Sequence, residues 1–303
     1  EGARADEVTS GVAEHTLAIV NPAAGDGAGA RVGTDLAREL ESSGFKVEII
    51  QTPAPGEAAR IAREASVDGC RTVIAVGGDG TANEIANGLV DTGTALALYP
   101  IGSGNDFARA LGYPRRRRDL ARFLAGARRR VIDVGEVNGR IFVNAAGVGI
   151  DGHVAERVEA SARIVGPVLG YFVGALVSIA SYRPQPMRVR IDGQVLEGKH
   201  LIVVAANGTH FGSGMHVAPK AKVDDGLFDI VVAGDLGRWA SLVALAKLYR
   251  GTHVNGREVV AFRARALDVE LQRELPAQAD GEPLRARALN VRMRPGALTV
   301  LSR

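Results

Sequence analysis

Short hydrophobic runs alternate with segments of helical spacing through the first half of the chain. Apolar runs of about five residues are typical of buried strands, and apolar residues three or four apart are typical of helices. Strands are expected at Thr16–Val20, Lys46–Ile50, Thr72–Val76 and Ala95–Tyr99, and helices at Gly29–Ser42, Glu57–Glu64, Ala82–Val90 and Asn105–Leu111. This alternation predicts an α/β fold with a doubly wound parallel sheet, in which ligands bind at the carboxyl ends of the strands.

The pattern changes near Val131, after which strands dominate. Strands are expected at Arg140–Val143, Met187–Ile191, His200–Ala205, Phe228–Val232, Val259–Ala264, Leu267–Leu271 and Leu289–Met293. Asp-Gly pairs, which favour turns, separate several of them. Only Ala155–Tyr182 and Arg238–Leu248 have a helical pattern. We therefore expect an α/β domain over residues 1–131 and a mostly antiparallel domain over residues 132–293.

The segment Ile164–Tyr182 carries no charge and approaches the length of a membrane-spanning helix. Its glycines, its serines and Pro167 favour a buried helix of a soluble domain instead. Its functional interpretation is a helix that walls an apolar substrate site or touches a bilayer.

Composition narrows the class of protein. Of the 303 residues, 46% are hydrophobic, enough for a sizeable core, whereas only 5% are aromatic, which argues against a nucleic-acid binder that stacks bases. A single cysteine, Cys70, rules out an internal disulfide framework and fits a reducing compartment. The polar segment Glu1–Val12 shows no signal-peptide pattern, so a cytoplasmic protein is expected.

The formal net charge is only +3, but arginines cluster at Arg115–Arg118 and Arg128–Arg130. Such runs usually form a solvated surface. The functional interpretation is a patch attracted to anionic lipid, which would make the protein peripherally membrane-associated. No nucleic-acid motif accompanies the patch, and no nucleic-acid partner is expected.

Three glycine-rich turns follow predicted strands, at Asn21–Gly29, Val76–Glu84 and Pro100–Phe107. Glycines let a backbone approach an anion closely, and a helix N-terminus presents N–H groups to it. Asp79 would then lie beside phosphate, where Mg²⁺ is its natural partner. Each turn could also be a tight connection without a ligand. The spacing Gly25-x-Gly27-x-x-Ala30 fits a loose dinucleotide fingerprint as well, which leaves an NAD(P)-binding dehydrogenase as an alternative.

Two carboxylate-rich turns lie in the second half. Asp280-Gly281-Glu282 is either a hairpin turn or a turn that presents a carboxylate base to the nucleotide across an interdomain cleft. The run from Lys220 to Gly226 is either a simple turn or a carboxylate cluster for a structural Mg²⁺.

Several blocks occur together in one order along the chain. They are Asn21–Gly25, Gly77–Glu84 with Asn87-Gly88-Leu89, Gly102–Arg109, Asn144–Gly149, Ala218–Ala221 with Asp224–Leu227, and Asp280-Gly281-Glu282. This set resembles the diacylglycerol kinase catalytic domain family, particularly its soluble bacterial lipid kinases. Ser103 stands where the family usually has threonine, and both residues carry the hydroxyl that can contact phosphate.

The resemblance implies an NAD kinase/diacylglycerol kinase-like fold, with an ATP-binding α/β domain, a β-sandwich domain and a C-terminal tail (294–303) that returns to the first domain. It implies that Asp280 is a general base, that Asp79 is a Mg²⁺-linked catalytic carboxylate, and that Asp224, Asp225 and Leu227 form a second Mg²⁺ site. The nucleotide site implied by these blocks comprises Asn21, Pro22, Gly25, Gly77, Gly78, Gly80, Thr81, Glu84, Gly102, Ser103, Asn105, Asp106 and Glu282.

The function expected from these features is ATP- and Mg²⁺-dependent phosphorylation of a diacylglycerol-type hydroxyl, a step of phospholipid biosynthesis. A sphingoid or ceramide kinase is the nearest alternative, followed by an NAD kinase and by a non-catalytic nucleotide- or lipid-binding protein. Asn105 or Asp106 could serve mainly as a helix N-cap. A homodimer is possible.

Overall fold

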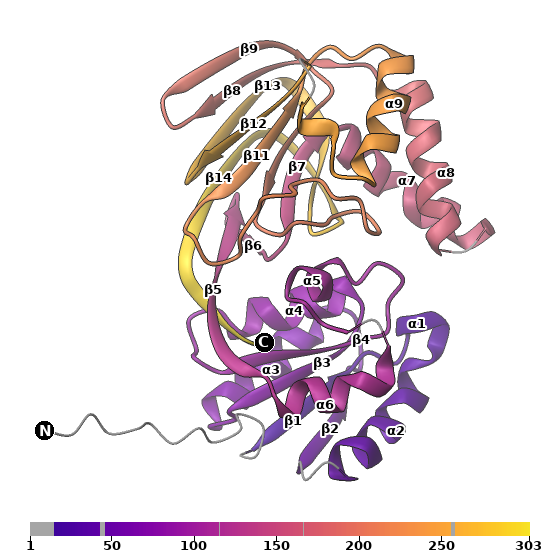
Figure 1. Cartoon of the computed structure of the whole chain (residues 1–303), viewed down its shortest axis with the longest axis vertical. Helices are drawn as coiled ribbons and strands as arrows, with labels where there is room; N and C mark the ends of the chain where they lie inside the picture. The colour runs from indigo at the N-terminus through magenta and orange to yellow at the C-terminus, as the bar shows by residue number, and fades with distance from the viewer. Residues whose placement is uncertain (1–14, 43–45, 115, 166, 256–257) are drawn as a thin grey trace, which may run out of the picture.

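The computed structural model describes residues 15–42, 46–114, 116–165, 167–255 and 258–303. These residues form two lobes stacked along the long axis of the molecule (Figure 1). The predicted arrangement, a parallel α/β part followed by an antiparallel β-rich part, is confirmed.

The first lobe is built on four parallel strands in the order β2-β1-β3-β4. They are β1 (Thr16–Val20), β2 (Val47–Gln51), β3 (Thr72–Gly77) and β4 (Ala95–Pro100). Residues of β1 and β3 are buried throughout, because helices cover both faces of the sheet and no side of these strands meets water. The helices are α1 (Ala24–Gly27), α2 (Gly29–Ser42), α3 (Glu57–Val67), α4 (Asp79–Leu89), α5 (Asp106–Ala110), η1 (Arg117–Asp119) and α6 (Leu120–Ala125).

The second lobe contains antiparallel strand pairs. Its strands are β6 (Arg140–Phe142), β7 (Ala145–Gly149), β8 (Gln185–Ile191), β9 (Gln194–His200), β10 (Ile202–Ala206), β11 (Phe228–Ala233), β12 (Val259–Ala264) and β13 (Ala266–Ala279). Its helices are α7 (Ile150–Val165), α8 (Pro167–Ser181), α9 (Arg238–Leu248) and η2 (His253–Asn255), and α7, α8 and α9 gather on one side of the strands (Figure 1).

The sequence of strand β10 is apolar without interruption, and its position between two cores explains why. Side chains alternate between the two faces of a strand. Val203 and Ala205 enter the core enclosed between strands, whereas Val204 and Ala206 enter a second core beneath the helices. Both faces of β10 are therefore buried.

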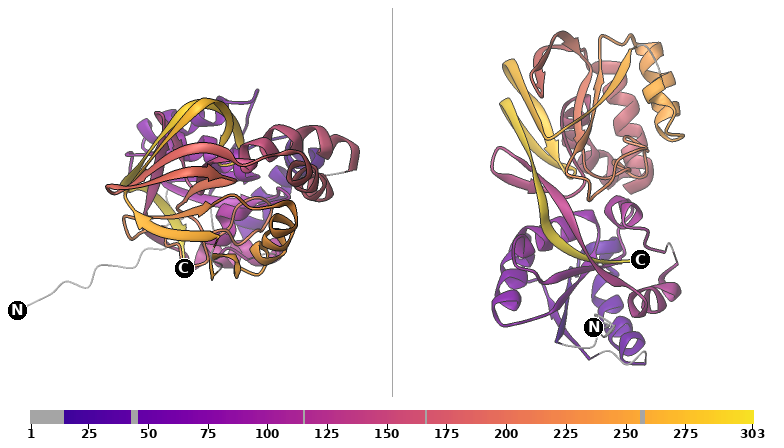
Figure 2. Two further views of the ribbon diagram at one scale, coloured as in Figure 1. Left: turned by 90° about the horizontal axis from the view of Figure 1, so that it is seen from above. Right: turned by 60° about the vertical axis from the view of Figure 1, so that its left-hand side comes forward.

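A long two-stranded ribbon joins the lobes (Figure 2). β5 (Arg128–Val137) pairs antiparallel with β14 (Glu282–Ser302), and the end of β14 pairs parallel with β4 in the first lobe. The phenol of Tyr113 anchors this end, since it donates to the carbonyl oxygen of Leu301 at 2.7 Å and accepts from the amide of Leu98 at 3.2 Å. The domain boundary predicted at residue 131 lies inside β5.

Some elements differ from the expectation. The helical segment predicted at Ala155–Tyr182 is two helices, α7 and α8, on either side of residue 166, which lies outside the described residues. β7 and β9 were not predicted, because β7 consists of small residues and β9 is largely exposed, so neither has an apolar signature. β13 and β14 are much longer than predicted, because pairing between strands extends them through charged stretches. Within the described ranges, no helix has both the length and the apolar character required to cross a bilayer.

Candidate active site

A cleft between the lobes collects carboxylates from distant parts of the chain. Asp79, Ser103 and Asp106 line it from the first lobe, and Asp280 and Glu282 line it from the second. Its volume is about 460 Å³. Five of the residues predicted for the nucleotide and catalytic site are thus brought together.

The three predicted glycine turns lie in contact with one another at the edge of the parallel sheet. The Asn21 amide nitrogen Nδ2 donates to Thr81 Oγ1 at 3.0 Å, which joins the first turn to the second. A Cβ on Gly102 would lie 2.6 Å from the Cα of Gly78, so the second and third turns approach more closely than any side chain permits. Gly25, at φ +61°, leaves no room for a Cβ against the Ile101 carbonyl oxygen, 2.9 Å away.

Asp79 begins α4, and its Oδ1 accepts the backbone N–H of Phe107 at 3.1 Å. Burial raises the pKa of Asp79, while the backbone N–H groups of residues 105–107 and the Arg109 guanidinium favour its charged form. The carboxylate therefore lies against the third turn.

Asp106 is 4% exposed and links the lobes. Its Oδ1 accepts from Arg109 Nη1 at 3.0 Å, and its Oδ2 accepts from the backbone N–H of Ser213 in the second lobe at 2.9 Å. Burial, and then the charge of Asp79, raise the pKa of Asp106 to about 6.

Asp79 and Asp106 are a candidate pair of ligands for a divalent cation. A Cβ on Gly104 would lie 2.8 Å from Asp79 Oδ2 and 3.8 Å from Asp106 Oδ2, so both oxygens face a cradle that only glycine leaves open. Hard cations such as Mg²⁺ prefer carboxylate oxygens, and a cation here would offset the repulsion between two like charges. The described residues contain no group of three or more metal-ligating side chains, so the Mg²⁺ site stays a prediction.

Asp280 occupies a two-residue hairpin between β13 and β14. Asp280 and Gly281 have φ values of +49° and +86°, as a type I′ turn requires. Its Oδ2 accepts from Asn83 Nδ2 at 2.6 Å and from the N–H of Val143 at 2.7 Å. Its Oδ1 accepts from the backbone N–H groups of residues 144 and 145 at 2.8 and 2.9 Å. The turn is therefore a hairpin and also presents a carboxylate to the cleft.

Burial raises the pKa of Asp280 above its ordinary value, and the four N–H donors oppose that rise because they favour the carboxylate form. A raised pKa makes this carboxylate a stronger base than an ordinary aspartate, as suits a group that accepts a proton. The catalytic role of Asp280 stays a prediction.

Other predicted nucleotide-site residues have structural contacts. Glu84 Oε2 accepts the backbone N–H of Gly56 at 3.1 Å, just before α3, and Glu84 does not line the cleft. Asn105, in the N-cap position of α5, donates from Nδ2 to the carbonyl oxygen of Gly102 at 2.6 Å. Glu282 reaches toward the second turn, since its Oε1 lies 3.7 Å from the position of a Cβ on Gly80. Pro22 and Gly77 belong to the first two turns and do not line the cleft either.

The predicted second Mg²⁺ site is engaged by arginines. Asp224 Oδ2 pairs with Arg130, whose Nη2 lies at 2.7 Å, and Asp225 pairs with Arg263. Asp225 Oδ1 also accepts the N–H of Leu227 at 3.2 Å, which closes the turn. The guanidinium groups balance the negative charge of these two carboxylates, and the second Mg²⁺ site stays a prediction.

The arginine clusters are partly engaged as well. Arg129 donates to the carbonyl oxygens of Arg71, at 3.1 Å, and of Gly93, and Arg130 binds Asp224. Arg116, Arg118 and Arg128 are exposed, while Arg115 lies outside the described residues. The predicted contact with anionic lipid stays a prediction.

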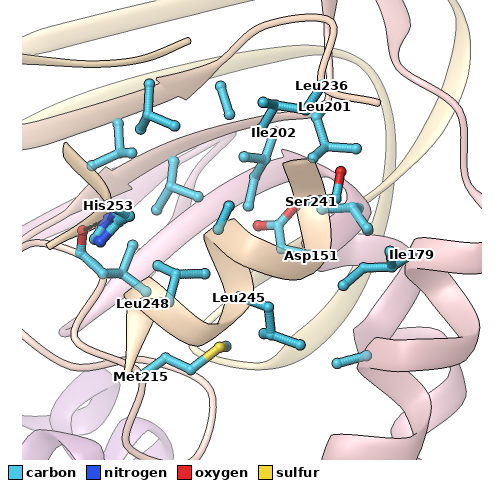
Figure 3. A pocket seen from close by; sticks show the side chains of 18 of the residues that line it. Asp151, Ile179, Leu201, Ile202, Met215, Leu236, Ser241, Leu245, Leu248 and His253 are labelled. Carbon is cyan, nitrogen blue, oxygen red and sulfur yellow. Dashed lines mark hydrogen bonds between the residues drawn. The ribbon is translucent and has the colours of Figure 1, made fainter. Parts of the chain in front are cut away.

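A second, apolar pocket lies beside the cleft and was not predicted as a pocket. Its walls come from β10, β11 and β12 and from α7, α8 and α9, and its volume is about 110 Å³ (Figure 3). Ala175 and Ile179 of α8 line it, so part of the uncharged segment Ile164–Tyr182 does wall an apolar cavity. Asp151 and Phe211 line both the pocket and the cleft, so the two cavities meet at these residues.

Asp151 is the polar group at this junction. Its Oδ2 accepts from Gln278 Nε2 at 3.2 Å, and its Oδ1 has no hydrogen-bond partner among the described residues. Burial raises the pKa of Asp151 to about 6. The block Asn144–Gly149, which the sequence analysis singled out, directly precedes Ile150 and Asp151 and could have pointed to this carboxylate.

Comparisons with known proteins agree with the geometry. The family model "Diacylglycerol kinase catalytic domain" matches residues 15–137, and the model "YegS C-terminal NAD kinase beta sandwich-like domain" matches residues 144–302. The chain is 29% identical over 271 residues to the diacylglycerol kinase of Bacillus subtilis strain 168, which covers 87% of this chain and 88% of that protein.

It is 36% identical over 263 residues to the Pseudomonas aeruginosa PAO1 protein named "Probable lipid kinase YegS-like", with 85% of each covered. A crystal structure of a diacylglycerol kinase from Bacillus anthracis strain Sterne superposes with a TM-score of 0.75 at 27% identity and covers 96% of this chain and 97% of that chain. The chain therefore belongs to the family of diacylglycerol kinases and YegS-like lipid kinases, and it is a lipid kinase.

Proposed function

We propose that this protein transfers the γ-phosphoryl group of ATP to the free hydroxyl of diacylglycerol and yields a phosphatidic-acid-type product. The observation that carries the proposal is the meeting of two unlike cavities at Asp151 and Phe211. A lipid alcohol has the same two parts, a polar end that reacts and an apolar tail that must be sheltered from water.

The glycine turns suit the nucleotide. Their backbone N–H groups can approach phosphate oxygens closely, and Ser103 adds a hydroxyl at the cleft. Phosphoryl transfer depends mainly on positioning and on stabilising charge. A Mg²⁺ ion held by Asp79 and Asp106 would neutralise charge on the phosphates.

Asp280 is the proposed general base. Its carboxylate accepts the proton of the attacking hydroxyl while the new O–P bond forms and the bond between the γ-phosphorus and the β-phosphate oxygen breaks. The four N–H donors hold both carboxylate oxygens in place, so the group needs no reorganisation before it acts.

The apolar pocket is the proposed site of the acyl chain. Its lining is apolar, apart from Asp151, Ser241 and His253. Asp151 would lie next to the glycerol backbone, where its unpartnered oxygen can bind a polar group of the lipid. Because such a substrate resides in a bilayer, the proposal includes peripheral membrane association and a role in phospholipid biosynthesis.

A direct assay tests the function. Purified protein is incubated with labelled ATP, Mg²⁺ and, separately, diacylglycerol, monoacylglycerol, sphingosine, ceramide and NAD. Label is expected in the product of diacylglycerol, whereas preferential labelling of sphingosine, ceramide or NAD would replace the proposed acceptor.

Two variants test the site. Asp79→Ala and Asp280→Asn are expected to lower turnover, the latter by about 10²–10⁴-fold, the usual range for loss of a general base. The control is Asp192→Asn, because Asp192 and Gly193 form the same kind of hairpin, with φ values of +42° and +87°, between β8 and β9 away from the cleft. A folded Asp280→Asn protein with near-normal turnover would show that Asp280 is not the base.

A further inference from the structure

The helix α9 is apolar on both of its sides, which is unusual for a helix at the surface. Its central stretch from Trp239 to Ala246 contains no charged residue. A surface helix normally carries charged or polar residues on the side that faces water, and a helix that is apolar all round is normally buried. The outer side of α9 is therefore expected to be covered by a partner or a membrane.

The inner side of α9 forms one wall of the apolar pocket. Ser241, Ala244, Leu245 and Leu248 line the pocket, at the spacing of one helical face (Figure 3). Only the thickness of this helix separates the pocket from the outer surface.

The outer side exposes large apolar side chains. Trp239 is 84% exposed and Val243 is 54% exposed. These positions and Ala246 follow one another at intervals of four and three residues, so they lie along one strip of the helix. On the neighbouring helix α8, Val177 is 47% exposed as well. Exposed apolar groups that gather in this way mark a surface that binds a partner or a membrane.

Positive charges stand at both ends of the strip. Arg238 precedes Trp239, and Lys247 and Arg250 follow Ala246. All three are exposed, and none forms an ion pair with a described residue. Asp235 is the single acidic residue between positions 235 and 250.

We propose that the outer side of α9 is the surface by which this protein docks on an anionic lipid bilayer. The inference rests on the proposed function, because it takes the pocket beneath α9 to hold an acyl chain. The strip would enter the interface with Trp239 at the level of the headgroups, where tryptophan is enriched, and the three cations would meet lipid phosphates.

A bilayer fits this surface better than a second copy of the chain. In a two-fold dimer the same strip pairs with itself. Both ends of the strip are positive, so self-pairing in either direction places like charges together. An anionic bilayer offers an apolar layer bordered by negative charge, which is complementary to this arrangement.

This surface is distinct from the arginine clusters that the sequence indicated. Those clusters flank α6 in the first lobe, whereas α9 lies in the second (Figure 1). A bilayer that rests on α9 also lies next to the pocket, so the lipid would pass from membrane to enzyme over a short path.

The test uses a property of the sequence: Trp239 is the only tryptophan in the chain, so its fluorescence reports on this surface alone. The full-length protein is titrated with phosphatidylcholine vesicles that contain phosphatidylglycerol. The expected result is a blue shift of the emission and quenching by lipids brominated on the acyl chains. Phosphatidylcholine alone, or high salt, is expected to weaken both.

Variants sharpen the test. Val243→Ser keeps the fluorophore and is expected to weaken vesicle binding severalfold, and Lys247→Gln with Arg250→Gln to weaken it by about fivefold for each cation removed. For each variant, the ratio of activity on vesicle diacylglycerol to activity on a water-soluble short-chain diacylglycerol should fall together with its vesicle binding. Val67→Ser is the matched control, because Val67 is 79% exposed on α3 in the other lobe; it should change neither quantity.

The outcomes separate the two proposals. If short-chain diacylglycerol is phosphorylated but the Trp239 emission stays unmoved and unquenched on vesicles, the docking surface is wrong and the kinase assignment stands. If no diacylglycerol is phosphorylated, the proposed function fails. A blue shift that grows with protein concentration in the absence of vesicles would identify a second copy as the occupant and overturn the proposal.

Discussion

Asp151 offers a quantitative test of the site, because the protein keeps a carboxyl group where burial opposes its charge. Its pKa is about 6 in the folded protein, against an ordinary value of 3.8. At about 1.4 kcal/mol for each pH unit, ionising this buried group costs the folded state about 3 kcal/mol at neutral pH. Asp151→Asn removes that cost and keeps an oxygen that can accept from Gln278.

The sign of the pH dependence follows from the raised pKa. Below pH 3.8 the Asp151 carboxyl is neutral in both the folded and unfolded states. Its burial then carries no cost from ionisation, so the stability that the neutral group gives the folded state is fully present. As pH rises toward 6, the unfolded chain loses its proton first, and the folded state loses this contribution. The gain from Asp151→Asn should therefore be about 3 kcal/mol at about pH 8 and roughly half of that at about pH 5.

Urea denaturation of both proteins at the two pH values measures this difference. Asp192→Asn, at an exposed hairpin, should show no such trend. A variant that is no more stable at either pH, or equally stabilised at both, would refute the reasoning. We also expect the stabilised variant to lose activity on diacylglycerol, because a destabilising buried charge is typical of a functional site.

Three further predictions concern the hairpin, the phosphate turns and the ribbon. Asp280→Asn places an amide against two N–H donors and should lower the free energy of unfolding by about 2–6 kcal/mol, measurable by urea denaturation; an unchanged midpoint would contradict the donor network. Gly102→Ala forces its turn away from Gly78 and should raise the KM for ATP and cost about 1–3 kcal/mol of stability; unchanged kinetics would show that the contact is not needed. Tyr113→Phe leaves the Leu301 carbonyl without its donor and should cost about 1–3 kcal/mol by thermal unfolding, with kcat retained; a wild-type melting temperature would contradict the anchor.

Periodicity predicted the βα order of the first lobe correctly, because strands buried on both faces must be apolar throughout. Prediction from periodicity was less accurate in the second lobe. β9 exposes most of its residues, and β14 carries charged side chains for much of its length, so pairing with other strands defines these elements more than composition does. The helix pair α7 and α8 was predicted as one helix, since both halves share a helical pattern.

The sequence alone determined the family, the order of the elements and the turns that carry the chemistry, because glycine and carboxylate spacing within a turn is a local property. The tertiary structure decided which of these groups meet. Asn83 and Asp280 are 197 positions apart, yet their side chains lie 2.6 Å from each other, because α4 and the β13–β14 hairpin meet where the two lobes pack together. The structure also gives contacts that the motifs did not predict, between Glu84 and the backbone N–H of Gly56 and between Asp224 and Arg130. Contacts between distant segments depend on how the two lobes pack, and no local sequence pattern predicts that packing.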